Sequence, residues 1–336
     1  SMDAFKANPQ RYDSLMTYKR CGNSGLKLPL ISLGLWHNFG GMDSLDNQKE
    51  LIRTAFNAGI THFDLANNYG PPPGSAEKNF GRLLKSDLKN HRDECVISTK
   101  AGYGMWEGPY GDWGSRKYLI SSLDQSLQRM NLDYVDIFYH HRPDPETPLE
   151  ETMGALDQIV RSGKALYVGI SNYSAALGIQ AQKILKDLGT PSIIHQLRYN
   201  LLDRSAEARV LPELMKAGMG SIVFSPLAQG ILSDRYLKCI PANSRASKVN
   251  FSDLNKTFIE DRLPLINQLN ALANKRSQSL AQMALAWCLR RPEVTSVLIG
   301  ASSAEQLKAN IDCLNNLSFS EDCLKSIDKL LSQEAH

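Results

Sequence analysis

The segment ITHFDLANNYGPPPGSAEKNFG, residues 60–81, contains a pattern that recurs along the chain: an apolar run, a polar turn and a helical stretch. Its first six residues, 60–65, have the apolar character of a buried strand, and a helix is predicted after Gly74. Asp64 therefore ends a strand, and Tyr69 lies in the loop that follows it. Because an Asp and a Tyr alone specify little, their partners must come from the rest of the chain.

The same alternation of a strand with a helix appears eight times. Residues 46–58 show helical spacing of apolar side chains, for example, and Gly59 ends that pattern. Another helix is predicted from Pro148, because Thr147, Pro148 and Glu150 combine a capping box with proline at the first helical position. Eight such units predict an α/β protein with a (β/α)8 TIM barrel. The strands are expected at residues 30–36, 60–65, 95–99, 134–139, 165–170, 192–196, 221–224 and 296–299.

Three features exceed a minimal barrel. Turn residues within 17–28 predict an N-terminal β-hairpin that closes the bottom of the barrel. A long loop, from residue 226 to about 256, follows the seventh strand, and long ordered loops are more often functional than idle. An extra helix is expected at the C-terminus, over 320–331. We therefore expect an N-terminal tail, residues 1–16, followed by one barrel domain, residues 17–336.

Composition narrows the class of protein. The 336 residues are 42% hydrophobic and 22% charged, which allows one large core. A net charge of +3 without a long basic run does not indicate nucleic-acid binding. No apolar run approaches the roughly 20 residues of a membrane helix, and no signal peptide is visible, so a cytoplasmic protein without membrane insertion is expected. The six cysteines are scattered, which predicts reduced thiols and no metal site.

Four polar side chains follow neighbouring predicted strands. Asp64 and Tyr69 follow the second strand, Lys100 the third and His141 the fourth, and the carboxyl ends of barrel strands form the active-site face. The set suits carbonyl reduction, because the alkoxide made by hydride addition must be protonated. Tyr69 would donate that proton, Lys100 would lower its pKa, and Asp64 would hold Lys100. His141 would orient the carbonyl oxygen. Each residue alone could instead be structural.

With these residues the sequence resembles the aldo-keto reductase superfamily, whose catalytic Asp, Tyr, Lys and His match Asp64, Tyr69, Lys100 and His141. His140 is expected to be a shell residue, since adjacent strand residues point to opposite sides. The nearest subgroups in resemblance are the bacterial L-glyceraldehyde 3-phosphate reductases and the β subunits of voltage-gated potassium channels. The motifs that carry this resemblance are FDLANNYGPPPGSAEKNFGRLL, ISTKAGYGMWEGPYG, DIFYHHRPDPETPLEET, GKALYVGISNYS and FSPLAQGIL.

A nicotinamide cofactor is implied by the resemblance. No GxGxxG motif joins a strand to a helix, so a Rossmann site is not indicated. In the resembled family the nicotinamide lies across the barrel mouth, and here Arg235 and Arg245 would neutralise its phosphates. NADP(H) is expected and NAD(H) is the second choice, because Ala301 and Gln306 supply no charge for a 2′-phosphate. The expected cofactor-binding residues are Trp36, Asp64, Ser171, Asn172, Gln196, Phe224, Ser225, Pro226, Leu227, Gln229, Gly230, Arg235, Arg245, Gly300, Ser302, Gln306 and Asn310.

The resemblance also implies the substrate. It points to NADPH-dependent reduction of small aldehydes or ketones, of the L-glyceraldehyde 3-phosphate or methylglyoxal type. A substrate phosphate would need a cationic contact, for which Arg142 and Lys117 are candidates. The alternative is a cofactor-binding regulatory subunit, as in potassium channels, and a metal-dependent hydrolase is a third interpretation. Homo-oligomers are common in these subgroups, so an oligomer is left open. The expected substrate pocket consists of Trp36, Tyr69, Tyr103, Trp106 and His141, with Trp113 as a further wall.

Overall fold

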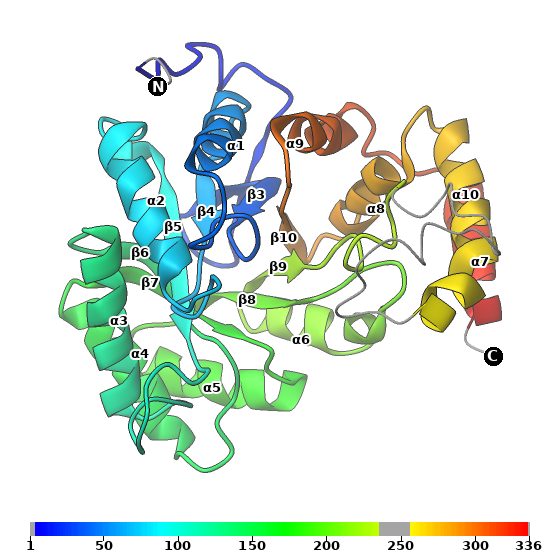
Figure 1. Ribbon diagram of the computed structural model, residues 1–336. Coiled ribbons are helices and arrows are strands. Elements are labelled where there is room, and N and C mark those ends of the chain that lie inside the picture. The colour runs from blue at the N-terminus through cyan, green and yellow to red at the C-terminus, as the bar shows by residue number, and fades with distance from the viewer. Residues whose placement is uncertain (1–3, 235–255, 335–336) are drawn as a thin grey trace.

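The structure is a computed structural model that describes residues 4–234 and 256–334. Eight parallel strands close into a barrel in the order β10-β3-β4-β5-β6-β7-β8-β9, with helices around the outside (Figure 1). The predicted (β/α)8 barrel is therefore confirmed. The barrel strands are β3 (Ile31–Gly34), β4 (His62–Asp64), β5 (Val96–Ala101), β6 (Val135–His140), β7 (Ala165–Ser171), β8 (Ser192–Arg198), β9 (Gly220–Phe224) and β10 (Val294–Ile299).

Several helices begin where a serine provides a cap. Ser115 and Ser174, for example, precede helices and accept a hydrogen bond from a backbone N–H of the first turn. The predicted capping box at Thr147 is wrong, because that hydroxyl donates to Asp144 instead and Pro148 is itself the residue before the helix. The helices are α1 (Leu45–Asn57), α2 (Ser75–Ser86), α3 (Arg116–Met130), α4 (Leu149–Arg161), α5 (Ala175–Leu188), α6 (Val210–Lys216), α7 (Lys256–Lys275), α8 (Leu280–Leu289), α9 (Ala304–Ile311) and α10 (Glu321–Glu334).

The predicted N-terminal hairpin is present as β1 (Tyr18–Arg20) paired antiparallel with β2 (Lys27–Pro29). Its side chains Cys21 and Leu28 are fully buried in an apolar cluster with barrel residues, so the hairpin closes the bottom of the barrel. Gly22 lets the hairpin approach closely, since an added Cβ would lie 2.3 Å from the carbonyl oxygen of Gly218.

Two segments outside the eight repeats are tied to the barrel. In the N-terminal tail, the Asn8 amide donates to Asn57 at 2.8 Å and Arg11 forms an ion pair with Glu94 at 2.6 Å. At the other end, the predicted C-terminal helix is α10, which packs with α7 to one side of the barrel (Figure 1). Residues 235–255 of the predicted long loop lie outside the described residues.

Candidate active site

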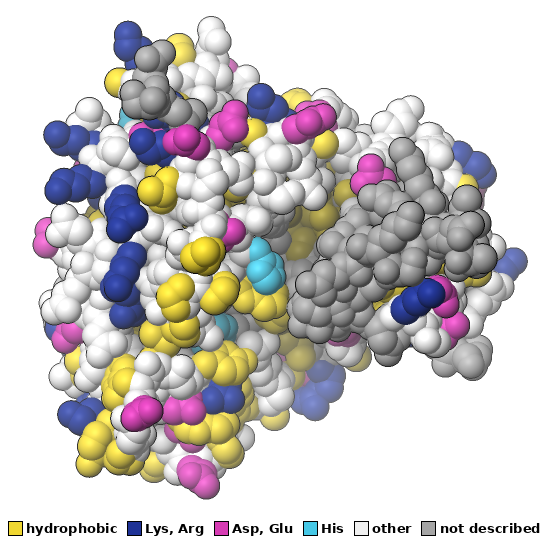
Figure 2. Space-filling view, viewed as in Figure 1, with side chains coloured by type: hydrophobic (Ala, Val, Ile, Leu, Met, Phe, Trp, Pro, Cys, Tyr) yellow, Lys and Arg dark blue, Asp and Glu magenta, His cyan; other side chains and the backbone are white. Residues whose placement is uncertain are grey.

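A cavity of about 1170 Å³ opens at the carboxyl ends of the barrel strands. In the space-filling view, hydrophobic side chains and a histidine gather around the hollow on this face (Figure 2). Its described lining comes from residues far apart in the sequence, including Asp64, Tyr69, His141, Gln196 and Phe224. The barrel thus brings together at its mouth the residues that the sequence placed after different strands.

Lys100 and Asp64 form a buried ion pair at the base of this cavity. The Lys100 Nζ atom donates to Asp64 Oδ2 at 2.6 Å and to the carbonyl oxygen of Leu65 at 2.8 Å, and both side chains are almost completely buried. Burial alone would lower the pKa of Lys100, but the Asp64 carboxylate, with a further contribution from Tyr69, offsets this effect and raises the pKa above its ordinary value. Lys100 is therefore a fixed ammonium group.

Tyr69 is held next to that ammonium by its loop. The Ala76 amide donates to the Tyr69 carbonyl at 3.2 Å, which ties the tyrosine to the start of α2, and Lys100 Nζ lies 4.9 Å from the centroid of its ring. Burial raises the pKa of the Tyr69 phenol, and the Lys100 charge opposes that rise without reversing it. Lys100 acts to lower the pKa of Tyr69, as expected, but burial outweighs it, so the predicted net lowering of that pKa is wrong. Tyr69 is thus a protonated phenol.

The two adjacent histidines have different surroundings. His140 is fully buried, with Nδ1 2.6 Å from the Tyr173 hydroxyl and Nε2 3.1 Å from the Trp113 carbonyl, so it is the hydrogen-bonded shell residue that alternation predicts. His141 lines the cavity, and its buried Nδ1 has no partner among the described residues. Burial, followed by the Lys100 charge, holds the pKa of His141 well below its usual range, so the imidazole is neutral.

Most of the expected cofactor residues lie around this one cavity. Ser171 is fully buried, donates to the Gln196 carbonyl at 2.9 Å and is not among the described lining residues. Asn310 is not among the described lining residues, and Arg235 and Arg245 lie outside the described part of the chain. The lining residues from the expected set are Trp36, Asp64, Asn172, Gln196, Phe224, Ser225, Pro226, Leu227, Gln229, Gly230, Gly300, Ser302 and Gln306.

The expected aromatic pocket is divided between the cavity and its support. Trp36, which is 46% exposed, and Tyr103 line the cavity. Trp106 instead packs against Tyr118, with ring centroids 5.4 Å apart, and is not among the described lining residues. Trp113 stacks on Arg142 at 3.7 Å. Of the three loop aromatics expected at the pocket, Tyr103 therefore lines the cavity, whereas Trp106 and Trp113 pack against residues outside the loop.

Arg142 and Lys117, the candidate hydrogen-bond donors to a substrate phosphate, contact other protein groups instead. Arg142 bonds to the Gly102 carbonyl and to Asp112, and its guanidinium lies 4.2 Å from the centre of the Tyr103 ring. Lys117 lies over the ring of Tyr110 at 5.4 Å. Neither is among the described residues that line the cavity.

Arg198 is a cavity residue that the sequence interpretation missed. It is the single Lys or Arg among the described lining residues, and the described residues include no carboxylate within ion-pair distance of it. Strand alternation could have found it, because Arg198 lies two residues after Gln196 on the same strand and both face the cavity. Other polar lining residues without an earlier role are His37, Asn38, Asn68, Ser233 and Asp234.

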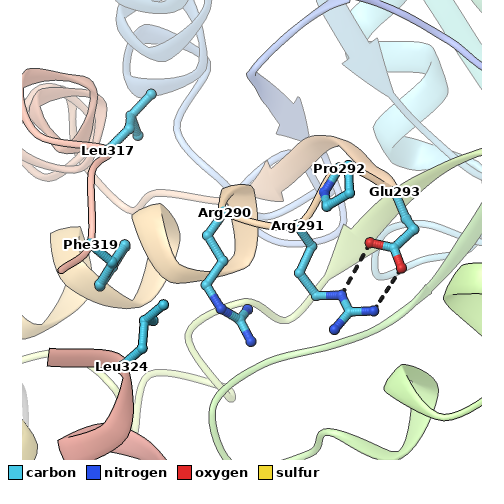
Figure 3. Close-up of a pocket in the computed structure, with 7 residues that line it drawn as sticks. All are labelled: Arg290, Arg291, Pro292, Glu293, Leu317, Phe319 and Leu324. Atoms are coloured by element: carbon cyan, nitrogen blue, oxygen red, sulfur yellow. Dashed lines mark hydrogen bonds and ion pairs between the residues drawn. The ribbon is translucent and has the colours of Figure 1, made fainter. Parts of the chain in front are cut away.

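A second cavity, of about 540 Å³, lies near the amino end of β10, away from the mouth (Figure 3). Arg291 is bound there by Glu293, with Nη2 and Oε2 2.6 Å apart. Arg290 stacks on Trp287 at 3.9 Å and donates to the Tyr199 hydroxyl at 3.1 Å. Its cations are thus already used in protein contacts, and this end of a barrel usually serves stability.

The described residues contain neither a cluster of metal-ligating side chains nor a helix that could cross a membrane. Within residues 4–234 and 256–334, no group of three or more His, Cys, Asp or Glu is placed to hold a metal ion. In the same residues, no helix is both long and apolar enough to cross a membrane. The described cysteines, Cys21, Cys95, Cys288, Cys313 and Cys323, are free thiols.

The fold and site define a barrel enzyme whose phenol, ammonium, carboxylate and imidazole meet at the mouth. Residues 30–332 match the aldo/keto reductase family, and the chain belongs to that family and is an oxidoreductase. It is 55% identical over 327 residues to L-glyceraldehyde 3-phosphate reductase of Escherichia coli (strain K12), covering 96% of this chain and 94% of that protein. It is also 38% identical over 305 residues to a probable voltage-gated potassium channel subunit beta of Oryza sativa subsp. japonica, covering 89% and 92%.

Proposed function

We propose that this protein reduces small aldehydes and ketones with NADPH, and that L-glyceraldehyde 3-phosphate is a substrate. The observation that carries the proposal is the fixed Lys100 ammonium beside the protonated Tyr69, with the neutral His141 on the same cavity. These three groups match the needs of carbonyl reduction: a proton, a charge to stabilise the phenolate left behind, and a hydrogen-bond donor for the carbonyl oxygen.

The proton would move from the Tyr69 hydroxyl to the carbonyl oxygen as that oxygen gains charge. The phenolate left on Tyr69 is then stabilised by Lys100, whose own charge is held by Asp64 at 2.6 Å. A neutral His141 can donate from one ring nitrogen to the same oxygen, in the manner of an oxyanion-hole group. Asp64 therefore acts through Lys100 and does not need to reach the substrate.

The cavity fits a nicotinamide cofactor, which would supply the hydride when bound. Its volume of about 1170 Å³ exceeds the roughly 300–1,000 Å³ of ordinary ligand pockets, so there is room for a dinucleotide beside a small carbonyl compound. Asn172 and Gln196 present amide groups that can pair with a carboxamide. The resemblance implies that Phe224 and residues 225–230 would lie along the rest of the cofactor.

The choice between the two nicotinamide cofactors depends on the far end of the cavity. Gln306 uses its Oε1 atom to accept from the Ser302 amide at 2.8 Å and from the Ser302 hydroxyl at 3.1 Å. This neutral cap offers a 2′-phosphate hydrogen bonds but no charge. NADPH stays our first choice from the resemblance and NADH the second, and the ratio of kcat/KM values with the two cofactors decides between them.

Arg198 supports a phosphorylated substrate. It lies on the strand position two residues beyond Gln196, roughly 7 Å further out along β8, while Gln196 Nε2 approaches Asp64 Oδ1 at 3.3 Å in the catalytic layer. A cation one layer above the catalytic groups suits a short substrate with an aldehyde at one end and a phosphate at the other. Methylglyoxal would use the same catalytic groups without that contact.

The test is NADPH oxidation by the purified protein with L-glyceraldehyde 3-phosphate, L-glyceraldehyde and methylglyoxal. We expect turnover with all three and the highest kcat/KM with the phosphorylated aldehyde. Absence of turnover with every small aldehyde and ketone, together with association with a membrane channel, would favour the regulatory-subunit alternative suggested by the 38% identical relative. Activity that survives metal chelation would exclude the hydrolase interpretation.

A further inference from the structure

A chain of buried polar side chains runs from Asp64 down into the barrel. Ser98 Oγ donates to Asp64 Oδ1 at 2.7 Å, and His62 Nε2 lies 2.8 Å from the same Ser98 oxygen. On the other side of the ring, His62 Nδ1 lies 2.8 Å from Ser32 Oγ, which is 2.7 Å from Ser296 Oγ. Apart from Asp64, none of these side chains is used in the chemistry proposed above, and all of them are shielded from solvent.

Strand alternation explains why they meet. His62 and Asp64 lie two residues apart on β4, and Ser98 and Lys100 lie two apart on β5, so all four point into the barrel. Thr99, between the last two, points outward and donates to Glu77 in α2 at 2.8 Å. The interior of the barrel therefore has a polar layer directly beneath the catalytic layer.

The hydrogen positions in this chain have one consistent direction. Because Ser98 spends its single proton on Asp64, its oxygen must accept, and His62 must then carry its proton on Nε2. His62 Nδ1 is left as an acceptor for the Ser32 hydroxyl, whose oxygen accepts from Ser296. Burial lowers the pKa of His62 to about 4, so the ring is neutral and has one N–H to give. Every donor points toward the Asp64 carboxylate.

We propose that Ser98 and His62 are positioning residues for the reduction: their directed hydrogen bonds hold the Asp64 carboxylate so that Oδ2 meets Lys100. Oδ1 accepts from Ser98 at 2.7 Å and from Gln196 Nε2 at 3.3 Å, which leaves Oδ2 for the ammonium at 2.6 Å. Without the Ser98 hydroxyl, the His62 N–H would be buried without an acceptor, and only the longer contact from Gln196 Nε2, at 3.3 Å, would hold Oδ1, so the carboxylate could rotate away from Lys100. The inference rests on the proposed function, because it concerns how the proton donor's neighbour is kept charged.

A purely structural role makes a different prediction. If these hydrogen-bonded side chains only filled the barrel, Ser98→Ala and Ser296→Ala would lower stability by similar amounts and leave the pH dependence of turnover unchanged. If it positions Asp64, the effect on turnover must fall with distance from that carboxylate. Ser98 donates directly to the carboxylate, whereas Ser296 is separated from Ser98 by three further hydrogen bonds.

The first experiment measures kcat against pH for the unsubstituted protein and for Ser98→Ala, Ser98→Thr and Ser296→Ala. We expect roughly a 10-fold loss of kcat in Ser98→Ala, the size typical of a lost hydrogen bond to a charged group, with little loss in Ser98→Thr and Ser296→Ala. The basic limb of the profile should move to lower pH in Ser98→Ala only, because Lys100 loses part of the charge that raises its pKa. An unmoved profile, or equal losses in both alanine variants, overturns the proposal.

A second readout does not depend on turnover. In ¹⁵N-histidine-labelled protein, His62 should show its proton on Nε2 and an unprotonated Nδ1 at neutral pH, and this tautomer should be lost or mixed in Ser98→Ala. A proton on Nδ1 in the unsubstituted protein would overturn the directed chain, even if reduction proceeds. Absence of reduction in the unsubstituted protein would instead reject the proposed function, with the tautomer still measured. Thermal unfolding of each variant shows that it is folded.

Discussion

The cavity at the barrel mouth and the cavity near the amino end of β10 use charged and polar groups differently. At the mouth, the described residues leave His141 Nδ1 without a partner and Arg198 without a carboxylate. At the other end, Arg291 is bound to Glu293, and Arg290 both stacks and donates to its neighbours. Because His141 Nδ1 is buried and His141 lines the cavity, a bound ligand can complete its hydrogen bonding, and the exposed Arg198 on the same cavity is open to an anion.

The largest expected effect that tests this comparison comes from Tyr69→Phe. Removing the hydroxyl deletes the proton donor, and general acid groups typically contribute roughly 10²–10⁴-fold, so kcat should fall by about that factor. Cofactor affinity should stay within about twofold, since the ring remains. Steady-state NADPH oxidation and a fluorescence titration of NADPH measure the two quantities.

Tyr103→Phe is the matched control, because Tyr103 lines the same cavity but lies against His141 with its ring, at a centroid distance of 4.7 Å. It should keep most of the activity. Comparable losses in the two variants would mean that the cavity needs aromatic shape and that Tyr69 is no proton donor.

The next effect in size is expected for His141→Ala. Loss of one donor to a developing oxyanion costs roughly 10²–10³-fold in kcat, and His141→Asn should recover part of it by keeping an N–H group. Because the pKa of His141 is well below its usual range, the ring stays neutral as pH falls through 6.5. Turnover should therefore show no loss from His141 protonation near pH 6.5. A limb near 6.5 that disappears in His141→Asn would contradict the neutral donor.

The sequence allowed the barrel and the meeting of Asp64, Tyr69, Lys100 and His141 to be predicted, because strand ends in a closed parallel sheet must converge on one face. The separation of His140 from His141 followed from alternation alone. These features depend on local periodicity and on one topological rule, and both can be read from a single sequence.

Other features depend on packing that periodicity does not encode. Whether Thr147 caps a helix or bonds to Asp144 is decided by the local path of the loop. Arg142 was a candidate to bind a substrate phosphate, but in the structure its guanidinium contacts two aromatic rings and Asp112. The net pKa of Tyr69 depends on how far burial outweighs Lys100, which no motif states.

A smaller and more selective effect is expected for Arg198→Gln. Loss of a charge-assisted contact should lower kcat/KM for L-glyceraldehyde 3-phosphate by about 10-fold, since hydrogen bonds to charged groups are worth about 1.5–3 kcal/mol. The value for L-glyceraldehyde, which has no phosphate, should stay within about twofold. Arg198→Lys keeps the charge and should recover part of the loss.

The same variant also separates the two phosphate sources at the mouth. Equal losses with both aldehydes, together with weaker NADPH binding, would assign Arg198 to a cofactor phosphate and reject it as the substrate contact. Unchanged kinetics with every reactant would mean that Arg198 contacts neither the substrate phosphate nor a cofactor phosphate.

The smallest effect on turnover is expected at the other cavity, for Arg291→Gln. Glu293 is 7% exposed, so removing its partner should leave a largely buried carboxylate without its ion pair and lower the free energy of unfolding by about 1–2 kcal/mol, between the values for exposed and buried pairs. Because the pair lies near the amino end of β10, kcat/KM should not change. Glu293→Gln in the Arg291→Gln background should restore part of the stability, since no unpaired carboxylate remains. Urea unfolding and NADPH oxidation measure the two quantities, and a more than twofold loss of kcat in a folded Arg291→Gln protein would show that the two ends of the barrel are coupled.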